Sequence, residues 1–114
     1  MQEYYCPDRG DIVWIDFTPQ TGREQAGERP ALTLSPESYN RKIGLAIFCP
    51  ITTQIKGYPF EVAIPEGLKV HGVILSDQVR NLDWRMRRAR FCCKTPSLLI
   101  SEVLGQISTL LGTD

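Results

Sequence analysis

The sequence contains a single histidine, His71, and its four cysteines form no Cys-x-x-Cys pair. Two of the cysteines, Cys92 and Cys93, are adjacent, and neighbours of this kind are poor joint ligands of a zinc ion and poor disulfide partners. A Ser-His-Asp triad or a histidine-based metal centre would require this one histidine to meet distant residues. We therefore expect reduced structural thiols at Cys6, Cys49, Cys92 and Cys93, no metal and no cofactor.

The chain also has no charge of either sign in excess, since 13 basic and 13 acidic residues give a formal net charge of zero. A general attraction to nucleic acid is thereby excluded, and polyanion binding would need a local patch. No apolar run approaches the roughly 20 residues of a membrane span. The first eight residues contain neither a basic region nor an apolar stretch, so we expect no secretory signal and a cytoplasmic location.

A length of 114 residues without an internal repeat or linker predicts one domain over residues 1–114. Short runs of β-forming residues, separated by glycine, proline and polar residues, predict strands, and residues 45–51 form the most apolar of them. The polar residues 38–42 predict a turn. The expected strands are residues 11–17, 31–34, 45–51, 60–64 and 72–75, with 88–93 as a possible last one.

The C-terminal segment has the pattern of a helix. Thr95 is a suitable N-cap, Pro96 suits the first helical position, and Gly112 can end the helix. Between them, one apolar stripe predicts packing against a core, formed by Ile100, Val103, Leu104, Ile107, Leu110 and Leu111. Short strands followed by one helix indicate a mainly β (α+β) fold, a small antiparallel barrel-like sheet with the C-terminal helix packed on it.

The most highly charged loop is Arg23-Glu24-Gln25-Ala26-Gly27-Glu28-Arg29-Pro30, between the first two expected strands. Pro30 biases Arg29 toward an extended backbone, which helps to fix the direction of the arginine. A fixed cation near a carboxylate could bind an anionic substrate and transfer a proton. The alternative is a solvated charged turn.

Three polar segments lie at the ends of expected strands, and together they carry a carboxylate, a guanidinium, hydroxyls and amides. Few reactions can proceed on these groups alone. Cleavage of RNA by its own 2′-hydroxyl is one, since it needs a base for that hydroxyl, a cation for the phosphate and a donor for the leaving oxygen. DNA lacks the hydroxyl and would not be cut. The segments are residues 24–29, 52–54 and 77–78.

Four further features carry less specific signals, and two of them have two interpretations. The basic stretch from Arg85 to Lys94 is either a solvated edge or a polyanion-binding patch, and its role stays open. Trp14 lies in an expected strand and is assigned to the core, whereas Trp84 could belong to the core or to a partner surface. His71 is interpreted as a turn residue.

The sequence also carries a set of motifs that resembles the MazF/PemK (also called Kid) toxins of bacterial toxin–antitoxin systems. The shared residues run from near the start of the chain to about Trp84. They include Pro7-Asp8-x-Gly10-Asp11-x-x-Trp14, Glu24-Gln25-x-Gly27-x-Arg29-Pro30-Ala31, Leu34-Ser35-Pro36, Tyr39-Asn40, Pro50-x-Thr52-Thr53-Gln54, Lys56-Gly57-Tyr58-Pro59-Phe60-Glu61-Val62 and Asp77-Gln78-Val79.

This resemblance implies an SH3-like barrel, a homodimer, and a metal- and ribosome-independent endoribonuclease (mRNA interferase) that cuts single-stranded RNA at short sequences. It implies 2′,3′-cyclic phosphate and 5′-hydroxyl ends. It also implies inhibition by a cognate MazE-like antitoxin, which we expect to bind through a disordered acidic tail, and contact with DNA only through the antitoxin complex.

The resemblance places the family's catalytic arginine and threonine at Arg29 and Thr52, and the carboxylate proposed as base in part of the family at Glu24. Two departures bear on this assignment: Arg23 stands where some members have histidine, and Leu75 replaces an arginine that other members pair with the position of Asp77. Glu24 is therefore the preferred base. The RNA-binding candidates are Arg23, Gln25, Asn40, Thr53, Gln54, Lys56, Tyr58, Asp77, Gln78 and Arg80.

Several of these candidates have structural alternatives. Lys56 could be a plain surface lysine, Tyr58 could only pack its loop, and Asn40 could shape a turn. For the whole chain, the rival to an enzyme is a non-catalytic SH3-like binding module, or a toxin of the same fold that poisons DNA gyrase.

Overall fold

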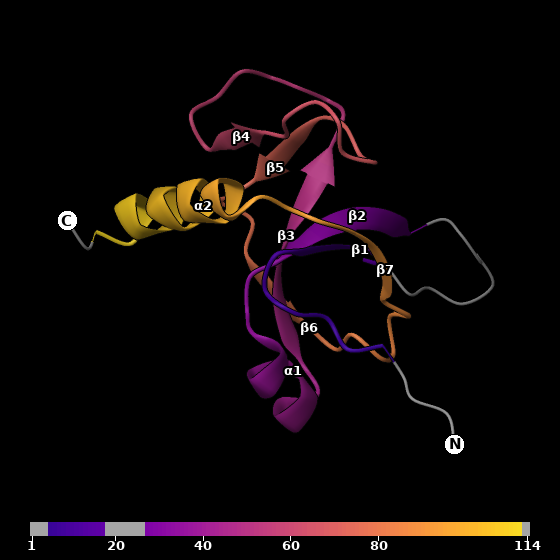
Figure 1. Ribbon diagram of the computed structural model, residues 1–114. Coiled ribbons are helices and arrows are strands. Elements are labelled where there is room, and N and C mark those ends of the chain that lie inside the picture. The colour runs from indigo at the N-terminus through magenta and orange to yellow at the C-terminus, as the bar shows by residue number, and fades with distance from the viewer. Residues whose placement is uncertain (1–4, 18–26, 113–114) are drawn as a thin grey trace.

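The structure is a computed structural model that describes residues 5–17 and 27–112 (Figure 1). Its described part contains seven strands and two helices. In chain order these are β1 (Asp11–Asp16), β2 (Glu28–Thr33), α1 (Glu37–Ile43), β3 (Ala46–Thr52), β4 (Glu61–Ala63), β5 (Val73–Leu75), β6 (Arg80–Leu82), β7 (Arg90–Lys94) and α2 (Ser97–Leu110).

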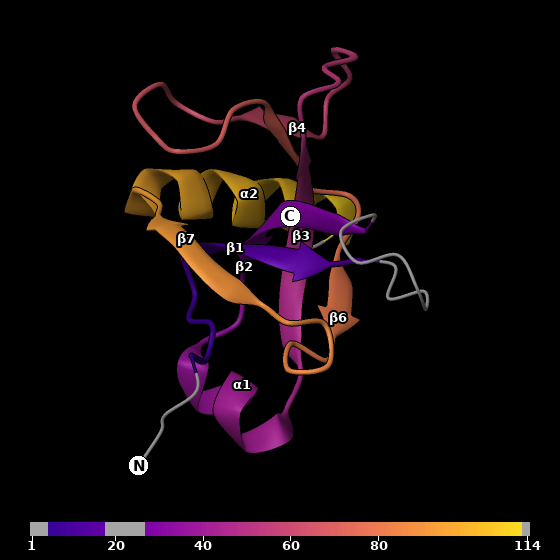
Figure 2. The same cartoon turned by 90° about the vertical axis from the view of Figure 1, so that its right-hand side faces the viewer.

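All of the described strand pairs are antiparallel, in the order β4-β5-β3-β2-β1-β7. The central strand is β3, which pairs with β2 along one edge. Along its other edge it pairs with β6 near its start and with β5 near its end. The sheet curls so that β7 and β6 lie on opposite sides of β1 and β2 (Figure 2). The mainly antiparallel sheet with a C-terminal helix confirms the expected fold class.

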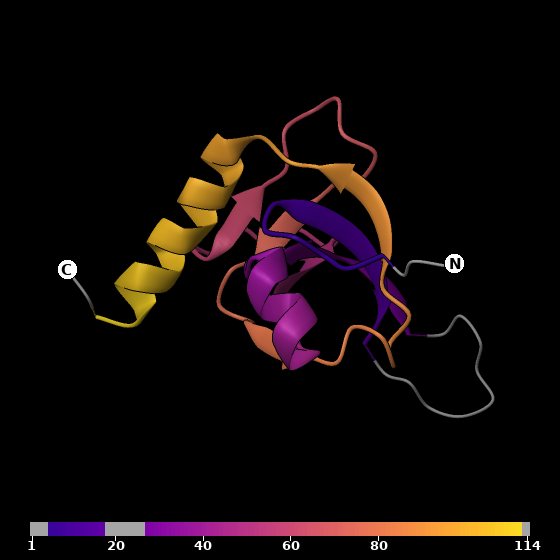
Figure 3. The same cartoon turned by 60° about the horizontal axis from the view of Figure 1, so that its bottom comes forward.

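Neighbouring residues of the inner strands enter two different cores, because successive side chains of a strand point to opposite faces of the sheet. Ile12 and Leu32 belong to a cluster that also contains Ile100 and Val103 of α2. Val13 and Ala31 belong to a second cluster, with Trp84. Figure 3 shows α2 along one side of the sheet and α1 in front of the sheet. Both faces are covered, so the strands are apolar on both sides.

The structure corrects the sequence-based predictions at three places. Residues 38–42 belong to α1 instead of a turn, and the short strand β6 was not expected. Thr95 does not cap α2: its hydroxyl donates to the Gly10 carbonyl at 2.9 Å, and the helix begins at Ser97. The apolar stripe of α2 is buried only in its first half, because Leu104, Leu110 and Leu111 are 41%, 48% and 71% exposed.

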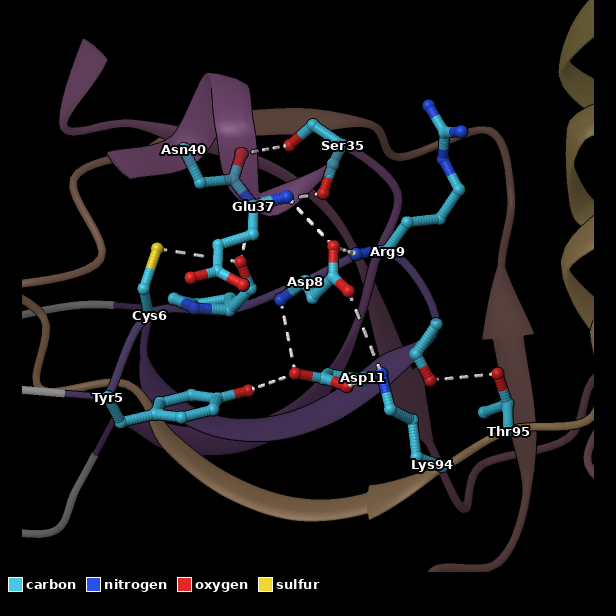
Figure 4. Close-up of polar contacts among 12 residues, drawn as sticks. Tyr5, Cys6, Asp8, Arg9, Asp11, Ser35, Glu37, Asn40, Lys94 and Thr95 are labelled. Atoms are coloured by element: carbon cyan, nitrogen blue, oxygen red, sulfur yellow. Dashed lines mark hydrogen bonds and ion pairs between the residues drawn. The ribbon is translucent and has the colours of Figure 1, made fainter. Parts of the chain in front are cut away.

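A buried polar network joins α1 to the N-terminal segment (Figure 4). Asn40 is fully buried, and its side-chain amide donates to the carbonyls of Pro7 and Ser35 at 2.8 and 2.9 Å. The Ser35 hydroxyl donates to the Asn40 side-chain oxygen at 2.6 Å, and the Trp84 indole donates to the Asn40 carbonyl at 3.0 Å. Trp84 is thus a core residue, 2% exposed.

A second part of the same network surrounds the carboxylate of Asp11, which is buried at the start of β1. The Tyr5 hydroxyl donates to one of its oxygens, and Lys94 lies 2.7 Å from the other. This hydrogen bond to Asp11 is the main reason that the pKa of Lys94 is raised. All four cysteines are free thiols. No helix in the described ranges is long and apolar enough to cross a membrane.

Candidate functional site

Arg29 and Thr52 lie on the neighbouring strands β2 and β3. The two strands pair from Thr33–Phe48 to Ala31–Pro50, and Arg29 and Thr52 each lie two residues beyond that last pair. The strand pairing therefore leads two of the three residues predicted to be catalytic toward the same end of β2 and β3.

Both residues line a pocket of about 550 Å³. Its remaining wall comes from Trp14 of β1, from Pro30, and from residues 51–54 and 69–71. Arg29 is exposed and forms no ion pair with any residue that the structure describes. Among the described lining residues, Arg29 and Lys69 are cationic and none is a carboxylate. The pocket therefore suits an anionic group such as a phosphate.

A second, smaller pocket of about 100 Å³ adjoins the first, since Thr52 and Gln54 line both. Lys56, Tyr58 and Gln78 complete much of its wall. The loop that carries Lys56 and Tyr58 is held by Glu61, whose carboxylate oxygens accept hydrogen bonds from the backbone N–H groups of Lys56 and Gly57, each at 2.9 Å. Because this carboxylate binds backbone donors, it fixes the loop in place.

The hydroxyl of Thr52 is oriented by its own strand end. Its oxygen accepts a hydrogen bond from the backbone N–H of Gln54 at 3.1 Å. A hydroxyl that accepts one bond keeps its proton for another acceptor. Thr52 can therefore donate to an anion in the pocket without any change in the surrounding backbone.

The structure brings together most of the predicted RNA-binding residues that it describes. Thr53 and Gln54 line the larger pocket, while Gln54, Lys56, Tyr58 and Gln78 line the smaller one. Asp77 and Arg80 are exposed but belong to the described lining of neither, and Arg80 lies over the Phe17 ring at 5.4 Å.

The assignment of Asn40 to RNA binding is wrong for this structure. Its side chain is fully buried and its amide is occupied by Pro7 and Ser35, so it has no surface to offer a base. The alternative was right that the role is structural, but Asn40 anchors the helix α1 and does not shape a turn. Glu24, Arg23 and Gln25 lie outside the described residues, so their assignments remain predictions.

Besides the apolar residues Pro30, Ile51 and Val70, the larger pocket is lined by Trp14, Lys69 and His71, which were not among the candidates from the sequence. Trp14 was assigned to the core, yet it is half-buried and faces the pocket. Lys69 and His71 come from the connection between β4 and β5. They reach the site because β5 pairs with the end of β3, a pairing that no local pattern of the sequence indicates.

Cys49 lies on the same strand as Thr52, inside the core. Burial, followed by the negative charge of Asp77, raises the pKa of its thiol to about 12. Such a thiol stays protonated at neutral pH and is not a nucleophile. The chemistry of the site therefore depends on the exposed polar groups.

Comparison with protein families gives a match over residues 8–111 to the PemK-like, MazF-like toxins of type II toxin–antitoxin systems. The endoribonuclease toxin MazF of Escherichia coli K12 is 53% identical over 112 residues, which cover 98% of this chain and 100% of that protein. Endoribonuclease PemK of Escherichia coli is 32% identical over 108 residues, covering 91% of this chain and 81% of PemK.

Solved structures give the same result. MazF of Deinococcus radiodurans superposes with a TM-score of 0.87 and 52% identity, over 96% of this chain and 99% of that one. A MazE–MazF structure from the same organism gives a TM-score of 0.86 and 47% identity, over 96% of this chain and 98% of that one.

Proposed function

The chain belongs to the PemK-like, MazF-like family of type II toxins and is a MazF-like endoribonuclease toxin, and from this premise we propose a mechanism for it. It cuts single-stranded RNA at short sequences, independently of ribosomes, in the cytoplasm. The 2′-hydroxyl next to the scissile phosphate is the nucleophile, and the products carry 2′,3′-cyclic phosphate and 5′-hydroxyl ends. The observation that supports this mechanism is the juxtaposition of Arg29 and Thr52 in one cationic pocket.

Arg29 stabilises the phosphate as negative charge accumulates on it. The guanidinium is planar, always charged and able to make two parallel hydrogen bonds to phosphate oxygens. Because it has no carboxylate partner among the described residues, its charge remains available to a substrate. Arg29 can also donate a hydrogen bond to the departing 5′-oxygen, which takes its proton from water.

Thr52 and Glu24 complete the chemistry in this proposal. The Thr52 hydroxyl, oriented by the N–H of Gln54, donates to a non-bridging phosphate oxygen. Glu24 takes the proton of the 2′-hydroxyl. Asp77 is the next candidate for the base, although the described part of the larger pocket does not include it.

The rival function, a binding module without chemistry, lacks support in the comparisons, because the relatives that cover nearly the whole chain are named endoribonucleases. An assay with mixed RNA in EDTA tests the proposal directly. The protein should produce discrete cuts that disappear in Arg29→Ala. Uncut RNA, or cutting only after a divalent ion is restored, would contradict the proposed reaction.

An antitoxin is the protein partner of this family, as the MazE–MazF structures indicate. We infer that the antitoxin of this chain binds the pocket through an extended acidic tail with apolar anchors, and so competes with RNA. DNA is contacted only through that complex. A saturating tail peptide that left RNA affinity unchanged would exclude direct competition.

We also propose that the toxin is a two-fold homodimer. Leu104 and Leu110 of α2, and Leu111 directly after it, are exposed leucines that a second copy could cover. A dimer would also present two copies of the pocket to a longer RNA strand. Light scattering should give twice the chain mass of 12.9 kDa, and a monomer at micromolar concentration would contradict this.

A further inference from the structure

Trp14 occupies an unusual place for a tryptophan on a core strand. Its neighbours Val13 and Ile15 on β1 are fully buried, whereas Trp14 is half-buried and lines the larger pocket with Arg29 and Thr52. One side of the residue packs against the cluster beneath α2. A large aromatic surface therefore lies beside the two groups that hold the scissile phosphate.

The cross-strand neighbours of Trp14 fix its position. The β1 strand pairs it with Pro30 on one side and with Arg90 on the other. The guanidinium of Arg90 lies over one face of the Trp14 ring, 5.7 Å from its centroid. Arg90 is itself held by Glu28, whose two carboxylate oxygens each accept a guanidinium hydrogen bond at 3.2 Å.

These contacts give the ring a preformed setting. The β1 strand pairs with β2 on one side and with β7 on the other, so the Arg90–Glu28 pair spans β1 from one neighbouring strand to the other. The pair places over one face of the indole a cation whose charge Glu28 partly compensates. Pro30 adds apolar surface to the pocket beside the ring. A flat ligand with a nearby negative charge fits the part of this setting that lines the pocket.

We propose that Trp14 is a base-stacking platform, on which one nucleobase next to the scissile phosphate rests while Arg29 and Thr52 hold the phosphate. Aromatic side chains beside a cationic groove bind single-stranded nucleic acid in this way, because every base offers a π-face. Trp14 is thus a substrate-binding residue that contributes to affinity and not to the chemical step. This inference rests on the proposed function, because it assumes that RNA occupies the pocket.

The fluorescence of Trp14 reports this contact directly. The chain has two tryptophans, and Trp84→Phe leaves Trp14 as the sole emitter. The probe is a 2′-deoxy oligonucleotide with the sequence of an RNA site that the protein cuts, and the control is inorganic polyphosphate. The oligonucleotide should quench Trp14 and polyphosphate should not, because it has charge without bases. If Trp84→Phe fails to fold, the same titration is carried out on the wild type and on Trp14→Phe. The difference in quenching between these two proteins is then the signal of Trp14.

Binding of the same oligonucleotide to two variants supplies the second measurement. Trp14→Leu should weaken binding by about tenfold, and Trp14→Phe, which retains an aromatic ring, by no more than about threefold. Single-turnover cleavage at sub-saturating enzyme should fall with the loss of binding, more in Trp14→Leu than in Trp14→Phe. Thermal unfolding shows that each variant is folded at the assay temperature.

The outcomes separate the inference from the function on which it rests. Absence of quenching, equal quenching by polyphosphate, or a folded Trp14→Leu that binds as tightly as the wild type would overturn the stacking role. None of these results would show that the protein does not cleave RNA. If the wild type binds the oligonucleotide but leaves the RNA form uncut, the proposed function fails, while the quenching still decides the role of Trp14.

Discussion

Gly72 packs directly on the backbone of Thr52. Its φ is +114°, and a Cβ added to it would stand 2.1 Å from the Thr52 carbonyl oxygen and 2.8 Å from the carbonyl carbon. A real Cβ cannot approach so closely, so only glycine fits at this position. The contact fixes the end of β3, and with it the threonine hydroxyl in the pocket.

Gly72→Ala should therefore impair cleavage although no reacting group is changed. The methyl group must push the Thr52 backbone away, and a displacement of this size in a catalytic residue can reduce the rate by about a hundredfold. Gly67→Ala is the matched control, because Gly67 also has a positive φ, of +100°, but nothing within 4 Å of the added Cβ. The measurement is the single-turnover rate of each folded variant. Equal rates for the two variants would show that the contact does not position Thr52.

Arg29→Ala should lower the rate of the chemical step by about a hundredfold, or ~3 kcal/mol, since this is what one preorganised donor to a developing charge is worth. Arg29→Lys keeps the charge but loses the bidentate geometry, so its rate should lie between those of the wild type and Arg29→Ala. Binding of the 2′-deoxy analogue should change much less than the rate. If Arg29→Ala weakened binding but left the single-turnover rate unchanged, Arg29 would contribute to RNA binding alone.

Thr52→Val should cost less than Arg29→Ala, because it removes one neutral hydrogen bond. Thr52→Ser, which keeps the hydroxyl, is its control and should remain close to the wild type. The Gln54 N–H loses its acceptor in the valine variant, so thermal unfolding is measured alongside cleavage. Loss of activity in Thr52→Ser equal to that in Thr52→Val would assign the effect to packing.

Much of this molecule follows from its residue pattern. The β-forming residues of 11–17 predict β1, and the apolar run 45–51 predicts the central strand. Both strands are apolar because both faces of the sheet are covered. The polar residues 38–42 misled the prediction, since α1 is anchored by one buried polar residue, Asn40, and not by an apolar stripe.

Motifs predicted part of the candidate site. Arg29 and Thr52 were both predicted from the sequence, and both line the larger pocket. Their catalytic roles remain predictions. Lys69 and His71 were missed because they reach the pocket only through the pairing of β5 with β3. Trp14 was assigned to the core because its position in a strand does not tell whether the sheet is covered at that residue or open to a pocket.

Alkaline pH should destabilise the fold. The pKa of the Cys49 thiol rises from 9.0 to about 12 on folding, chiefly through burial. A raised folded pKa gives stability that is fully present below the unfolded value and is lost as the pH climbs from there to the folded value. Burial and its hydrogen bond to Asp11 raise the pKa of Tyr5 in the same direction.

The free energy of unfolding should thus fall above pH 9, at a slope of at most about 1.4 kcal/mol per pH unit from Cys49. Urea unfolding on both sides of this value measures the slope. Cys49→Val removes the titrating group at similar volume and should flatten it. An identical slope in the variant would mean that other groups dominate.

The central claim is that the substrate's own 2′-hydroxyl attacks the phosphate held by Arg29 and Thr52, with Glu24 as its base. The most direct measurement is single-turnover cleavage in EDTA of an RNA with one deoxynucleotide at the cut site, compared with the all-ribose strand and with Glu24→Gln. The account predicts no cut in the substituted RNA, cyclic phosphate and 5′-hydroxyl ends from the all-ribose strand, and slow cleavage with unweakened binding in Glu24→Gln. Cleavage of the deoxy-substituted strand at the normal rate, or products with 5′-phosphate ends, would contradict it.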